Sequence, residues 1–80
     1  MDKRLLDKKI IVTGGSRGIG AGIVKRLFNE GAEIIIADIK ANLAKQLIEE
    51  LNTKKIIFIQ TDLSKEDDIV KLFELTKKHW

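Results

Sequence analysis

A glycine-rich stretch near the start of the chain carries the most specific chemical signal in the sequence. It runs from Thr13 to Gly20 as Thr-Gly-Gly-Ser-Arg-Gly-Ile-Gly. Glycine lets the backbone approach a ligand closely because it has no Cβ, and the N–H groups that open a helix have no partner within that helix. A glycine turn from a strand into a helix is therefore typical of a site that holds a pyrophosphate. A tight turn that needs glycine only for steric reasons is the alternative.

The segments on either side of this stretch have the periodicities that such a turn requires. Residues 9–13, with the sequence Lys-Ile-Ile-Val-Thr, form a short β-branched run that predicts a buried strand. After the turn, apolar residues recur at helical spacing, at Ile19, Ile23, Val24, Leu27 and Phe28. The turn does not end in Gly-Lys-Ser or Gly-Lys-Thr, so hydrolysis of ATP or GTP through a Walker loop is not expected.

The rest of the chain repeats this alternation of strand and helix. Residues 33–38 and 55–60 are apolar runs that predict two further strands, and residues 43–51 have helical spacing between them. Ser64 is the predicted N-cap of a last helix. The expected packing face of that helix consists of Ile69, Val70, Leu72, Phe73 and Leu75. Strands that are apolar on both faces and joined by helices predict an α/β fold with a parallel sheet, in the order βαβαβα.

Asp38 follows the second predicted strand, at the sheet edge where the glycine turn is expected. It stands about twenty residues beyond that turn, where a carboxylate can accept hydrogen bonds from both hydroxyls of an adenosine ribose. The same charge would repel a 2′-phosphate, which favours NAD over NADP. Arg17 and Lys40 are cations that could reach such a phosphate, and Arg17 is kept as a cofactor-binding candidate. Alternatively, the Asp38 side chain only accepts hydrogen bonds from the backbone of the turn into the next helix.

Asp62 and Leu63 close the third predicted strand, beside the expected position of an adenine. The carboxylate can accept a hydrogen bond from the adenine amino group, while the backbone of Leu63 can address a ring nitrogen. Equally, Asp62 could help to cap the helix that follows. At the chain end, His79 is expected to be solvated, and Trp80 is expected to pack against residues elsewhere.

Together these features resemble the short-chain dehydrogenase/reductase family over essentially the whole chain. The resemblance rests on Thr13-Gly14-x-x-x-Gly18-x-Gly20, on Asp38 and on Asp62-Leu63. It implies a Rossmann-like half with three parallel strands in the order 3-2-1, in which residues 1–80 form the N-terminal half of a dinucleotide-binding domain. It assigns the adenosine ribose to Asp38 and the adenine to Asp62 with Leu63. The residues that it assigns to the pyrophosphate and its ribose are Gly14, Ser16, Gly18, Ile19 and Gly20.

The catalytic part of that family lies outside these residues. The family places an Asn-Asn-Ala-Gly strand, a serine and a Tyr-x-x-x-Lys pair further along, whereas this chain stops at Trp80 and contains no tyrosine. No catalytic residue is assigned, and we expect a truncated NAD(H)-binding segment of an oxidoreductase that is not catalytic alone. Two alternatives remain. The chain could be a stand-alone nucleotide-binding module, or a homo-oligomer or strand donor that pairs with a missing C-terminal half, because its first strand would be an open edge.

Composition limits the other function classes. The net charge of +3 comes from scattered lysines with acidic neighbours, so nucleic-acid binding is not expected. The absence of cysteine excludes disulfides and thiolate metal sites, and no metal site is assigned. No apolar run approaches the length of a membrane span and no signal-peptide core follows the first residues, so a soluble cytoplasmic protein is expected.

Overall fold

Three strands and three helices alternate along the chain. The structure is a computed structural model that describes residues 4–14 and 18–80. The elements are β1 (Lys9–Thr13), α1 (Gly18–Asn29), β2 (Glu33–Asp38), α2 (Ala41–Leu51), β3 (Ile56–Gln60) and α3 (Glu66–His79). The predicted element order is confirmed, and the third strand begins one residue later than expected. Within the described residues, no helix combines the length and the hydropathy needed to cross a membrane.

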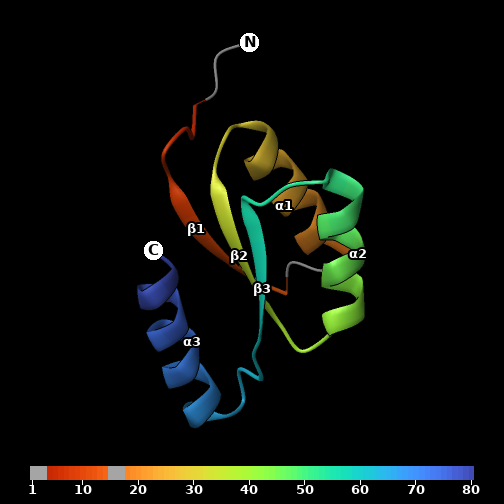
Figure 1. Cartoon of the computed structure of the whole chain (residues 1–80). Helices are drawn as coiled ribbons and strands as arrows, with labels where there is room; N and C mark the ends of the chain where they lie inside the picture. The colour runs from red at the N-terminus through yellow and green to blue at the C-terminus, as the bar shows by residue number, and fades with distance from the viewer. Residues whose placement is uncertain (1–3, 15–17) are drawn as a thin grey trace.

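β2 is the central strand of a parallel sheet with the order β1-β2-β3, as Figure 1 shows. This arrangement confirms the predicted order 3-2-1. Thr13 pairs with Ala37 at the end of β1, and Asp38 pairs with Gln60 at the end of β3. The carboxyl ends of all three strands therefore lie side by side at one edge of the sheet.

Alternation of side chains along the strands divides the core between the two faces of the sheet. On one face, α1 and α2 pack against the strands through buried residues such as Val24 and Leu47. On the other face, Leu72 of α3 packs against Ile35. Figure 1 shows α1 and α2 on one side of the sheet and α3 on the other. Because β2 is covered on both faces, its residues 34–37 are all buried, which explains its uninterrupted apolar sequence.

The predicted packing face of α3 is wrong for three of its five residues. Leu72 is buried and Ile69 is half-buried, and the next turns place Thr76 and Trp80 on the same side of the helix. These four residues, spaced three or four apart, form the stripe of α3 that packs against the sheet. The exposed residues are Val70 (51%), Phe73 (62%) and Leu75 (40%). These side chains lie outside the contact between α3 and the sheet, because α3 is the only described element that covers this face of the sheet.

The start of α3 also differs from the prediction. The N-cap residue is Lys65 rather than Ser64, and its side chain makes no cap hydrogen bond. The Ser64 hydroxyl instead donates to Asp62 Oδ1 at 2.6 Å, and the Ser64 N–H donates to the same oxygen at 3.0 Å. Asp68 Oδ2 reaches back from the first turn of α3, which starts at Glu66, and accepts the N–H of Asp62 at 2.9 Å. The Ser64 hydroxyl is thus oriented toward the preceding carboxylate, and the helix begins one residue later than a Ser64 cap would require.

Candidate functional site

A small pocket lies at the carboxyl ends of the three strands. Its volume is about 270 Å³. Parallel α/β sheets bind their ligands at this edge. Four residues that sequence analysis singled out, Gly14, Asp38, Asp62 and Leu63, are brought together here from three separate strand ends. The full lining consists of Gly14, Ala37, Asp38, Ile39, Thr61, Asp62, Leu63 and Ser64.

Asp38 ends β2 and shapes the turn into α2. Its Oδ1 accepts hydrogen bonds from the backbone N–H groups of Ile39 at 2.6 Å and Lys40 at 3.2 Å. The side-chain amide of Gln60 donates to the carbonyl of Ile39 at 3.4 Å and so ties this turn to the end of β3. The structure therefore shows Asp38 in the turn-forming role that sequence analysis gave as the alternative to ribose binding. The same bonds hold the carboxylate at the wall of the pocket.

Asp62 follows β3 and makes the corresponding turn into α3. The hydrogen bond from the Ser64 hydroxyl is the main cause that lowers the pKa of Asp62, followed by the bond from the Ser64 N–H. Burial acts in the opposite direction, and the nearby charge of Lys65 lowers the pKa further. Asp62 is thus a carboxylate at neutral pH. Leu63, beside it, is 48% exposed at the pocket.

Gly14 and Gly18 follow β1 and open α1, respectively. Both have positive φ, 66° for Gly14 and 59° for Gly18, which side chains rarely adopt. The backbone therefore requires glycine at both positions, which agrees with the alternative interpretation that the turn needs glycine for steric reasons. Among the described residues, a Cβ at either position would nevertheless meet no atom within 4 Å, so the space beside them is open there. The predicted site residues Ser16 and Arg17 lie outside the described residues.

The start of α1 has the electrostatics of an anion site. Its first turn carries no acidic residue, whereas the first turn of α3 carries three. The first N–H groups of a helix have no partner within it, and the macrodipole makes that end partially positive. Gly14 adds no free N–H, because its own donates to the carbonyl of Ala37 at 2.9 Å. Ile19, which is 86% exposed, and Gly20 lie in the first turn of α1 but outside the pocket lining.

The family model described as short chain dehydrogenase matches residues 8–80. The chain belongs to the short-chain dehydrogenase family. It is 42% identical over 74 residues to tropinone reductase-like 1 of Erythroxylum coca, and 40% identical over 76 residues to (+)-borneol dehydrogenase 1 of Salvia officinalis. These alignments cover 92% and 95% of this chain. They cover only 27% and 29% of the two relatives, so the chain spans less than a third of the length of the curated relatives it matches.

This membership confirms the resemblance predicted from the glycine pattern and the two aspartates. Short-chain dehydrogenases are oxidoreductases that bind nicotinamide cofactors, and the similarity extends to sex determination protein tasselseed-2 of Zea mays. That protein is 44% identical over 69 residues, which is 86% of this chain and 20% of the relative. The matched region includes every candidate residue of the pocket, from Gly14 to Leu63.

Sequence reasoning missed four residues that line this pocket, namely Ala37, Ile39, Thr61 and Ser64. Thr61 is 2% exposed, and its hydroxyl donates to the carbonyl of Ile59 at 3.0 Å. Their positions in the sequence could have identified these residues. Each residue stands next to the last residue of β2 or β3, or next to a predicted site residue, at the edge where the strands end.

Acid is expected to weaken the turn that Asp62 makes with Ser64 in this chain. The folded pKa of Asp62 is below the unfolded one, so this stabilisation is present above the unfolded pKa and lost as pH falls through the folded pKa. Ser64→Ala removes the largest cause and is expected to raise the pKa of Asp62 toward its ordinary value. An NMR titration of the Asp62 carboxyl carbon measures this change. Lys65→Gln, which removes a weaker cause, is the control and should raise the pKa less; equal shifts would contradict the assignment.

Proposed function

We propose that these residues bind the ADP part of a nicotinamide dinucleotide, with a preference for NAD(H) over NADP(H), as the cofactor-binding segment of a short-chain dehydrogenase. One observation carries the proposal. Gly14, Asp38, Asp62 and Leu63 converge on one pocket at the carboxyl edge of the parallel sheet. A volume of about 270 Å³ is at the lower end for ligand sites, which suits part of a dinucleotide rather than the whole.

Each part of the ADP group has a matching chemical environment. The pyrophosphate binds at the N–H groups of the first turn of α1, where Gly18 leaves the approach open. Ser16 is assigned to the same group from the family resemblance alone, and Arg17 stays a cofactor-binding candidate as a cation that could reach a 2′-phosphate. The ribose hydroxyls donate to Asp38, and the adenine amino group donates to Asp62 while the Leu63 backbone addresses a ring nitrogen.

Two carboxylates on one small pocket support the preference for NAD(H). Asp38 and Asp62 both line it, and a hydroxyl or amino group can donate to either of them. A phosphate on the 2′-oxygen would instead bring two negative charges beside a carboxylate, which is unfavourable at contact distance. Lys40 is exposed and can offset only part of this repulsion.

The proposed role does not include catalysis by these residues alone. When bound, the nicotinamide ring supplies the hydride acceptor or donor of the reaction. The chain has no tyrosine, and its two serines, Ser16 and Ser64, belong to the glycine stretch and to the turn before α3. We therefore propose that the 80 residues form a truncated segment that does not transfer hydride by itself. The cytoplasmic location expected from the sequence stays a prediction.

Binding measurements with separate parts of the cofactor test this assignment. Titrations of the 80-residue chain by calorimetry are expected to give similar micromolar affinities for NADH and ADP-ribose, because both contain the whole ADP part. Nicotinamide mononucleotide, which lacks the adenosine, is expected not to bind. The proposal is wrong if the mononucleotide binds as tightly as ADP-ribose, or if ADP-ribose does not bind to the folded chain.

A further inference from the structure

Asp62 is held by hydrogen bonds at its side chain, its carbonyl and its N–H. The hydroxyl and the N–H of Ser64 both donate to Asp62 Oδ1. The Asp62 carbonyl accepts the N–H of Lys65 at 3.0 Å. The Asp62 N–H donates to Asp68 Oδ2 at 2.9 Å. Asp68 differs from the other two partners because it lies within α3, in the first turn of the helix.

The residue before Asp62 is held from the opposite direction, by the sheet. The N–H of Thr61 donates to the carbonyl of Asp38 at 2.9 Å, which continues the pairing of β2 with β3 by one residue. Thr61 is also buried. The sheet therefore fixes the chain before Asp62, and α3 fixes Asp62 itself through Asp68. The relative position of Asp38 and Asp62, the two carboxylates of the nucleotide pocket, depends on both contacts.

Asp68 reaches Asp62 from outside the nucleotide pocket. It is half-buried and lines a second pocket of about 270 Å³ at the same edge of the sheet. The two pockets share Ile39 and Asp62, whereas Asp68 lines only the second one. Asp62 therefore stands between the nucleotide pocket and Asp68. A ligand in the nucleotide pocket is influenced by Asp68 through Asp62 and not by direct contact.

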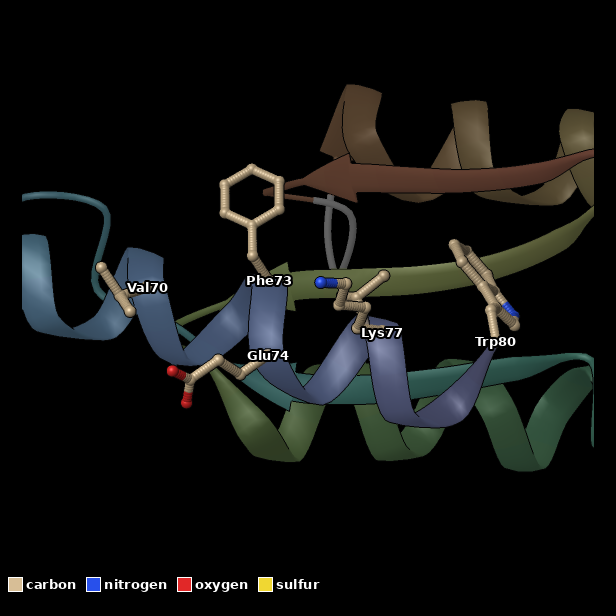
Figure 2. A pocket seen from close by; sticks show the side chains of 6 residues that line it. Val70, Phe73, Glu74, Lys77 and Trp80 are labelled. Atoms are coloured by element: carbon tan, nitrogen blue, oxygen red, sulfur yellow. The ribbon is translucent and has the colours of Figure 1, made fainter.

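The opposite side of α3 takes no part in this contact. An apolar groove runs along that side, and Figure 2 shows Phe73 and Lys77 among the residues that line it. Lys77 stands about two and a half helical turns after Asp68, so the two side chains leave the helix in opposite directions. The side of α3 that carries Asp68 is the one that faces the strand ends.

We propose that Asp68 is a positioning residue of the nucleotide site, whose carboxylate fixes Asp62 so that Asp62 Oδ2 stays available to the adenine amino group. This inference rests on the proposed function and extends it to a residue of α3. Both donors of Ser64 bind Oδ1, and within residues 4–14 and 18–80 no hydrogen bond reaches Oδ2. An acceptor that is already fixed before the ligand arrives binds more tightly and more selectively, because less conformational freedom is lost on binding.

Asp67 separates this role from the general effect of acidic residues at a helix start. Asp67 and Asp68 both lie in the first turn of α3, where a negative charge interacts favourably with the helix dipole. Asp67 is exposed, and its side chain makes no hydrogen bond within the described part of the chain. Asp67→Ala is therefore the matched control for Asp68→Ala, since both remove one carboxylate from the same helical turn.

Discrimination between two nucleobases tests the proposal. Deamino-NADH has an oxygen in place of the adenine amino group, so it cannot donate to Asp62 from that atom. The wild-type chain is expected to bind NADH about tenfold more tightly than deamino-NADH. Asp68→Ala is expected to lower this ratio to about threefold or less, because Asp62 is then no longer fixed. A variant that only unfolds more readily would weaken both ligands equally. An unchanged ratio in Asp68→Ala, or an equal fall in Asp67→Ala, would overturn the proposal.

Asp68→Asn is expected to rescue the discrimination. Its amide oxygen can still accept the Asp62 N–H, although the charge is gone. The ratio of the two affinities should return to within about twofold of the wild-type value. A ratio as low as that of Asp68→Ala would mean that the hydrogen bond to Asp62 is not what Asp68 contributes, and would refute the assignment.

Hydrogen exchange of the Asp62 amide, measured by NMR without ligand, tests the contact independently of nucleotide binding. Exchange is expected to be at least about tenfold faster in Asp68→Ala and unchanged in Asp67→Ala, because only the first removes the acceptor. Equal exchange in the two variants would contradict the proposal. A wild-type chain that binds neither dinucleotide overturns the proposed function, and the positioning role with it. A wild-type chain that binds NADH, with a base preference that does not depend on Asp68, overturns the positioning role alone.

Discussion

Replacing Gly18 with valine is expected to weaken the binding of NADH and ADP-ribose by about 100-fold or more, which corresponds to about 2.7 kcal/mol. Gly18 opens α1 with a φ of 59°, which a β-branched residue avoids. The valine side chain would also project into open space, since a Cβ at Gly18 meets no atom within 4 Å in the part of the chain that the structure describes. Both effects act on the first turn of α1, where we place the pyrophosphate. Calorimetric titration of the variant measures the loss.

Gly22→Val is the matched control for this experiment. Gly22 lies one turn further along α1 and is exposed, and a Cβ there would likewise meet no atom of the described residues within 4 Å. Its φ is ordinary for a helix, where valine is a better helix former than glycine. Binding should therefore survive in this variant. If Gly18→Val keeps wild-type affinity while circular dichroism shows an intact fold, the pyrophosphate does not bind at this turn.

Asp38→Arg is expected to shift the preference of the chain from NADH toward NADPH by about 100-fold in the ratio of the two affinities. The substitution removes repulsion between a carboxylate and a 2′-phosphate, which is worth about 1–3 kcal/mol at a partly exposed site. It also adds a guanidinium that can bind the phosphate with two parallel hydrogen bonds. Parallel titrations with NADH and NADPH measure the ratio. An unchanged ratio would remove Asp38 from the ribose site.

Asp38→Asn separates the charge of this side chain from its structural role. Asparagine keeps an oxygen that can accept the N–H groups of Ile39 and Lys40, so the turn into α2 is preserved. Loss of the charge alone is expected to shift the affinity ratio by about tenfold, less than the arginine does. A shift as large as that of Asp38→Arg would mean that loss of the carboxylate charge accounts for the whole effect and that the guanidinium adds nothing. An unchanged ratio would mean that the charge of Asp38 does not determine the preference.

The strands and the position of the site could be predicted because their signals are local. The bounds of β1 and β2 agree with the prediction, since a strand that is covered on both faces must be apolar at nearly every position. Asp38 and Asp62 were predicted to share an edge, and the structure places both in one pocket. Parallel strands that pair in register end together, so any residues that follow them must converge.

The start of α3 could not be predicted from preferences of single residues. Ser64 is a better N-cap than Lys65 by residue type, but its hydroxyl donates to the carboxylate of Asp62, and the helix begins one residue later than a Ser64 cap would require. Asp68 then satisfies the N–H of Asp62 from the other side. A competition between three neighbouring polar groups depends on their distances and angles, which residue type alone does not contain.

The sequence by itself determined the order of the elements, the parallel sheet and the chemical groups at its carboxyl edge, because apolar periodicity and glycine spacing act over a few residues. Only the tertiary structure decided which stripe of α3 meets the sheet. Leu72 is buried, whereas Phe73, the next residue, is exposed in a groove beside β1. An amphipathic helix can be rotated to bury either of two neighbouring apolar stripes. Which stripe is buried depends on contacts with residues far away in the sequence, such as that of Leu72 with Ile35, and these contacts exist only in the folded chain.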